Sequence, residues 1–215
     1  MEVGRTMSND TLSERLFADF CARHGVECLR VSRGSTPSPD FVIRLASTKV
    51  VCEVKQIDPN PDDRKELTEL HQTGSSGRWI PNRFRDKLKH VSPQLKGAGK
   101  PTMLVIYDNT PFKMYSKHRD VVQAMFGRHS VTVWAPDDPA QPMKVSEPFF
   151  GSNRGMSPAH NTAVSALAIL EGGPEQAQSL RVYHNPYAAV RLDPSLFEGL
   201  PVSQRILPDT REVNL

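Results

Sequence analysis

The sequence lacks any long hydrophobic run. No segment approaches the ~20 consecutive apolar residues that a membrane-spanning helix needs, so no membrane contact is expected. Residues 1–10 also lack the apolar stretch of a signal peptide, and they are expected to form a loose tail. Together these two absences predict a cytoplasmic protein.

Cysteine is scarce, and neither sign of charge dominates. Cys21, Cys28 and Cys52 lack zinc-finger spacing, and they are expected to be buried free thiols in a reducing compartment. The 27 basic and 24 acidic residues leave a net charge of +3, so any nucleic-acid contact must come from local clustering of charge. A Gly-x-x-x-x-Gly-Lys phosphate loop is also missing, which excludes a built-in ATPase of that type.

The most informative stretch that is present runs over residues 39–57. Two strand-like runs rich in valine and isoleucine are joined there by a short turn. Side chains alternate across a strand, so Glu53 and Lys55 share one face, and Asp40 opens the neighbouring strand close enough to converge on them. An ionised group among apolar residues is costly unless it is paired or binds a metal. These three residues are therefore the candidate catalytic residues.

Two carboxylates and an amine suit phosphoester chemistry. Mg²⁺ binds carboxylate and phosphate oxygens together and lowers the pKa of a bound water, while a lysine can orient that water or offset charge on the phosphate. Pro39-Asp40 and Glu53-Val54-Lys55 resemble the motif of the PD-(D/E)XK nuclease superfamily. The resemblance implies a metal-dependent nuclease, with an endonuclease favoured, in which Asp40 and Glu53 hold Mg²⁺ (or Mn²⁺ as a substitute) and Lys55 assists the reaction.

Two further residues have open roles. Residues 11–24 have the period of an amphipathic helix that ends at Gly25. An acidic residue on the first helix often joins the metal site of the resembled superfamily, and Glu14 is the matching candidate. Thr11-x-x-Glu14 is equally the pattern of a capping box, in which Glu14 only bonds back to the start of the helix. Gln56 is a weak site candidate that could simply pack.

A basic helix is expected between residues 78 and 100. Apolar residues recur there at helical spacing and leave a basic exposed side, which is typical of a surface that binds a phosphate backbone. The candidate nucleic-acid contacts are Arg78, Arg83, Arg85, Lys87 and Lys89, together with Arg33 in the loop before Asp40. Because no aromatic stacking platform is evident, double-stranded DNA is favoured over RNA or single strands. A basic surface helix without a ligand is the alternative.

The order of elements predicts an α/β fold. Residues 11–108 read as an αβββαβ core with a central mixed sheet flanked by helices, which is also the core order of the resembled superfamily. Residues 109–215 read as a C-terminal extension on the same sheet, with a helix at 118–126 and strands at 131–134, 163–170 and 180–184. Residues 58–79 and 136–148 are expected to be irregular, the former as a flap over substrate or as disorder.

Two function classes remain open from the sequence. One is the nuclease; the other is a catalytically inactive protein of the same fold that acts as a nucleic-acid-binding or protein-interaction module. Metal-dependent cleavage would favour the first, and salt-sensitive DNA binding without cleavage would favour the second. A homodimer is a further expectation, because mixed sheets of this class often pair.

Overall fold

A seven-stranded mixed sheet forms the centre of the molecule. The computed structural model describes residues 10–32, 34, 37–65, 68, 83–113, 115–138 and 140–206. The strand order is β1-β2-β3-β4-β9-β10-β11, with parallel pairs β3/β4, β4/β9 and β10/β11 and antiparallel pairs elsewhere. The strands are β1 Glu27–Arg30, β2 Phe41–Leu45, β3 Thr48–Ile57, β4 Thr102–Asp108, β9 Ala166–Gly172, β10 Ala177–His184 and β11 Val202–Arg205.

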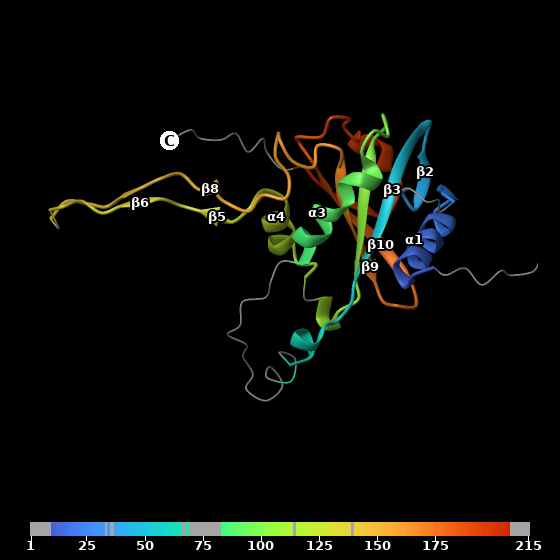
Figure 1. The fold of residues 1–215 in the computed structure, drawn as a ribbon, viewed down its shortest axis with the longest axis horizontal. Helices are drawn as coiled ribbons and strands as arrows, with labels where there is room; N and C mark the ends of the chain where they lie inside the picture. Colours follow the sequence, from blue (N-terminus) through green and yellow to red (C-terminus); the bar gives the residue numbers. More distant parts are fainter. Residues whose placement is uncertain are drawn as a thin grey trace, which may run out of the picture.

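Helices cover both faces of this sheet (Figure 1). They are α1 Leu12–Arg23, α3 Arg83–Leu95 and α4 His118–Phe126, with short 3-10 turns at Pro111–Lys113 and Pro194–Phe197. Helix α1 packs its apolar stripe on one face, and α3 and α4 pack on the other. None of the helices in the described part of the chain is long and apolar enough to cross a membrane.

The predicted α/β class and αβββαβ order are confirmed. The start of α1 has the capping box read from Thr11 and Glu14, and its end is followed by Gly25, whose φ of +67° lies in the left-handed region that favours glycine. Strand β4 is buried along its whole length, as its unbroken apolar run implies. Residues 109–215 contribute β9, β10 and β11 to the same sheet.

Several segments differ from the expectation. Residues 61–65, within the stretch expected to be irregular, are helical, since Asn60 and Asp63 cap that turn reciprocally. Residues 202–205, for which no strand was predicted, form β11 at the edge of the sheet beside β10. The strand predicted at 131–134 and the loop predicted at 136–148 form one ribbon with residues 149 and 150. Its strands are β5 His129–Ser130, β6 Val133–Trp134, β7 Lys144–Val145 and β8 Phe149–Phe150.

Two apolar cores lie on opposite faces of the sheet. Cys52 and Val54 of β3 point into the core beneath α1, whereas Val51 and Ile57 point into the core beneath α3 and α4. Because side chains alternate along a strand, Glu53 and Lys55 belong to the α3 face. The sheet therefore presents the predicted Glu-x-Lys pair toward the basic helix.

Candidate active site

Asp40, Glu53 and Lys55 lie together on the α3 face of the sheet. Residues 41 and 52 are opposite one another in the β2/β3 ladder, so Asp40, one residue before β2, is level with Glu53. The Asp40 backbone N–H donates to Cys52 O over 3.1 Å, and the Val54 backbone N–H donates to Asp40 Oδ2 over 2.8 Å. These two bonds hold the Asp40 carboxylate against β3, next to Glu53.

Glu53 is the unusual group of the site. Only 2% of the residue is exposed, its Oε1 accepts a hydrogen bond from Lys55 Nζ, and its Oε2 is buried without a hydrogen-bond partner among the described residues. Burial raises the pKa of Glu53 to about 7, and the nearby Asp40 carboxylate adds to this rise, while Lys55 opposes it. A buried carboxylate oxygen without a donor costs folding free energy, and such strain is typical of sites that bind a ligand.

These groups fit a divalent cation of the magnesium type. Mg²⁺ is usually bound by one or two protein carboxylates, and water and substrate phosphate oxygens complete its coordination. Asp40 and Glu53 supply two adjacent carboxylates, and Glu53 Oε2, which has no hydrogen-bond partner in the described part of the chain, could serve as an oxygen ligand. Within the described residues, no group of three or more His, Cys, Asp or Glu side chains is placed to hold a metal.

The structure does not bring Glu14 into this group. Glu14 Oε2 accepts from the Thr11 backbone N–H over 3.3 Å to close the capping box, and Arg30 Nη2 lies 3.3 Å from the same oxygen. Helix α1 covers the opposite face of the sheet from Glu53. The capping role left open by the sequence is therefore the one observed, with an ion pair added.

Gln56 also has a structural role on the α1 face. Its Oε1 accepts from the Ser13 backbone N–H over 3.0 Å, which ties the first turn of α1 to β3. Its Nε2 donates to Asp58 Oδ1 over 2.5 Å. Both ends of the side chain are thus engaged away from Glu53 and Lys55.

The basic residues of α3 have unequal surroundings. Lys87 is half-buried; burial lowers its pKa, and the positive charges of Arg83 and Lys55 lower it further. Arg85 is also half-buried, whereas Lys89 is exposed and pairs with Asp86 over 3.3 Å. The two other predicted contacts, Arg33 and Arg78, lie outside the described residues.

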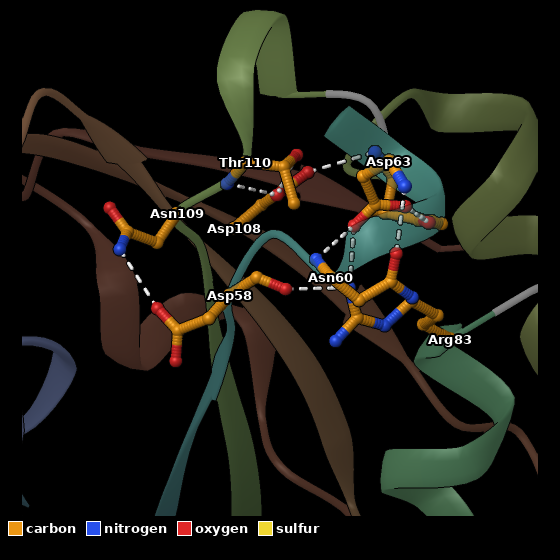
Figure 2. Close-up of polar contacts among 8 residues, drawn as sticks. Asp58, Asn60, Asp63, Arg83, Asp108, Asn109 and Thr110 are labelled. Carbon is orange, nitrogen blue, oxygen red and sulfur yellow. Dashed lines mark hydrogen bonds and ion pairs between the residues drawn. The ribbon is translucent and has the colours of Figure 1, made fainter. Parts of the chain in front are cut away.

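Arg83 takes part in a network that the sequence did not reveal (Figure 2). Its Nη1 lies 2.9 Å from Asp63 Oδ2 and donates to Asp58 O over 2.6 Å. The Tyr115 hydroxyl donates to the other Asp63 oxygen, and the Arg83 guanidinium lies over the Tyr115 ring, 5.3 Å from its centroid. Arg83 therefore anchors the segment after β3 to α3 and to the segment after β4.

The carboxylate of Asp108, the last residue of β4, is also buried and held by hydrogen bonds. Asp108 is 1% exposed and accepts four hydrogen bonds, from Thr110 N and Oγ1, Tyr115 N and Ser116 N, at 2.6 to 3.0 Å. Asn109 Nδ2 donates to Asp58 Oδ1 over 2.8 Å, so the segments that leave β3 and β4 are joined directly (Figure 2). In the sequence, the Asn60-x-x-Asp63 spacing, which is typical of a helix cap, could have indicated part of this network.

Comparison with protein-family models, with curated proteins and with solved structures found no match to this chain.

The buried Glu53 carboxylate predicts a specific pH dependence of stability. Its folded pKa of about 7 exceeds the ordinary value of 4.5, so the folded state binds more protons than the unfolded state within that window. The free energy of unfolding should therefore fall as pH rises through the window, by at most about 3 kcal/mol. In Glu53→Gln this contribution disappears, so the variant should gain stability relative to the wild type above the window but not below it.

Urea denaturation of both proteins below and above this pH window, without divalent cations, measures the difference. Subtracting the two curves removes the titration of all other groups that are unaffected by the substitution. A difference that does not change with pH would contradict the pKa assigned to Glu53.

Proposed function

We propose that this protein is a metal-dependent nuclease that hydrolyses phosphodiester bonds, with DNA the favoured substrate. The observation that carries the proposal is the adjacency of Asp40 and the buried Glu53, with Lys55 at hydrogen-bond distance; one Glu53 oxygen has no partner among the residues that the structure describes. Such an arrangement is costly for folding alone. A bound cation and a substrate phosphate would offset this cost by interacting with the carboxylates and with Lys55.

Each of the three residues has a distinct role in this proposal. Asp40 and Glu53 would hold Mg²⁺, which when bound activates a water and polarises the scissile phosphate. The backbone N–H of Val54 fixes the orientation of Asp40 in advance, so little ordering remains when substrate arrives. Lys55 donates to Glu53 in the structure and carries the positive charge that can stabilise the phosphoryl oxygens as negative charge develops on them.

Helix α3 would guide the nucleic acid to this site. Lys87 is half-buried on α3, which packs on the same face of the sheet as Glu53 and Lys55, and its positive charge adds to that of Lys55. Lys89 is exposed on the same helix, one turn from Arg85. Positive side chains beside a phosphoester site attract and position the backbone without reading its sequence.

Charge reversal on α3 should weaken DNA binding. Arg85→Glu with Lys89→Glu replaces two candidate phosphate contacts, so the affinity should fall by roughly tenfold or more, and the slope of log K against log salt should decrease by about 2. Fluorescence anisotropy with a labelled duplex over a salt series measures both quantities. Arg44→Glu with Lys49→Glu makes the same charge change around the β2–β3 turn and should have a smaller effect. Equal effects of the two double variants would remove α3 as the DNA-binding face.

The alternative, an inactive nuclease-fold protein that binds nucleic acid or a protein, is favoured by one observation. Glu14 is occupied by the capping box and Arg30, so the site has two carboxylates where the resembled superfamily often has three.

A cleavage panel decides between the two functions. Plasmid and oligonucleotide substrates, both DNA and RNA, are incubated with Mg²⁺, Mn²⁺ or EDTA. We expect cleavage of DNA that requires the cation; salt-sensitive binding without cleavage under every condition would favour the alternative.

A further inference from the structure

The ribbon formed by residues 129–150 projects from the body as an arm (Figure 1). It consists of β5 paired with β8 and β6 paired with β7, and neither pair belongs to the central sheet. Phe150 packs against Phe126 of α4 at the base, with ring centroids 5.7 Å apart. A lone two-stranded ribbon is only marginally stable in water, so an arm of this length is expected to contact something else.

One face of the arm is apolar and exposed. Val133 and Val145 are opposite each other in the β6/β7 register, and Val131 and Met143 lie two residues before them in the chain, just outside these strands. Residues opposite each other in an antiparallel ladder share a face, so Val133 and Val145 lie on one side of the ribbon. All four side chains are 50 to 66% exposed. A contiguous row of this kind is characteristic of an interaction surface.

Charge and proline content limit what this face can bind. Residues 129–150 contain one lysine and three carboxylates, a net charge of −2, so a phosphate backbone would be repelled. Pro136, Pro142 and Pro148 interrupt the strand edges and lack the N–H that strand addition needs. The arm is therefore suited to bind a protein through its apolar side chains.

The body of this chain offers a complementary surface. Since the whole chain carries +3 and the arm −2, the rest carries +5. Three large hydrophobic residues are exposed among the described residues outside the arm, and one of them, Ile206, lines a hollow of about 380 Å³. Leu192 and Pro194 contribute to its wall. Arg191 lines it too, and it is exposed and forms no ion pair with any described residue.

We propose that two copies of this chain form a reciprocal dimer in which the arm of each copy covers this hollow on the other. The apolar row of Val131, Val133, Met143 and Val145 packs on Pro194 and Ile206 in the hollow and on the exposed Val190, which precedes Arg191 in the chain, and the acidic tip at Asp137 and Asp138 faces Arg191. An exchange of identical arms closes with two-fold symmetry, so each contact is made twice. Half of a hairpin of 22 residues spans roughly 35 Å, about the diameter of a small domain.

Sedimentation velocity over a concentration series tests the apolar contact. We expect the wild type to dimerise, and Val133→Asp with Val145→Asp to weaken the dimer about a hundredfold. Trp134 is the matched control because it is 46% exposed on β6 but points to the other face of the ribbon. Trp134→Asp should leave the dimer intact. Circular dichroism establishes that each variant is folded.

Charge-reversal variants test whether the acidic tip of the arm contacts Arg191 at the hollow. Arg191→Glu alone and Asp137→Lys with Asp138→Lys alone should each weaken the dimer about tenfold, and the combined variant should recover most of the loss. A monomeric wild type, equal dissociation by Trp134→Asp, or no recovery in the combined variant would overturn the proposal. If the wild type is monomeric and Val133→Asp with Val145→Asp abolishes duplex binding, the arm binds nucleic acid instead of a second copy. None of these readouts depends on nuclease activity.

Discussion

Glu53→Gln and Asp40→Asn should each abolish cation-dependent cleavage, with a loss of about 10³-fold or more in turnover. Both changes keep the size of the side chain but remove the negative charge that a divalent cation requires. Glu53 is the more sensitive position because no described residue provides a hydrogen-bond partner for its buried Oε2. The fold should survive both changes, since the Asn carbonyl oxygen at position 40 can still accept from the Val54 backbone N–H.

Single-turnover cleavage of a labelled duplex measures this loss, with anisotropy as a separate readout of DNA binding. The two variants should bind DNA in the absence of cation at least as well as the wild type, because each removes a negative charge near the phosphate. Glu27→Gln is a matched control, since Glu27 is an exposed carboxylate of β1 that pairs with Arg44 over 2.5 Å. Cleavage by Glu53→Gln at the rate of this control would contradict the assignment of the active site.

Lys55→Met should reduce turnover by about 10²- to 10³-fold while the protein still binds the cation. Methionine keeps the apolar stem of the lysine, so the change isolates the ammonium. Lys55 also opposes the rise in the pKa of Glu53, so its removal should raise that pKa further. The optimum of the reaction should therefore move to higher pH in this variant, because Glu53 must be ionised to bind a cation.

The pH–rate profile of Lys55→Met separates a catalytic role from a merely structural one. Lys87→Met is the control, since Lys87 is a half-buried lysine of α3 that is assigned to substrate binding. It should weaken DNA binding more than it slows the single-turnover rate at saturation. A normal rate and an unshifted profile in Lys55→Met would remove Lys55 from the reaction.

The central hairpin could be predicted because its signals are local. The valine-rich runs fix β2 and β3, and strand alternation then places Glu53 and Lys55 on one face and requires no knowledge of distant contacts. The αβββαβ order followed from the same periodicities. For Glu14 the sequence offered two roles, and only the packing of α1 on the opposite face of the sheet distinguishes between them.

Other features depend on contacts between distant segments. Arg83 looked like a phosphate contact because its neighbours are basic, yet it pairs with Asp63, twenty residues earlier in the chain. The arm was predicted as a short strand and a proline-rich loop, since a two-residue pairing such as Val133 with Val145 leaves almost no periodicity. Its apolar face becomes evident only when both strands are seen side by side.

Cation binding to the wild type and to Glu53→Gln, measured by calorimetric titration of Mn²⁺ above the pH at which Glu53 ionises, tests the central claim most directly. The account predicts that the wild type binds the ion with release of few protons and gains thermal stability, whereas Glu53→Gln does neither. Equal binding by both proteins, or no binding by either, would contradict the proposal that Asp40 and Glu53 form a metal site.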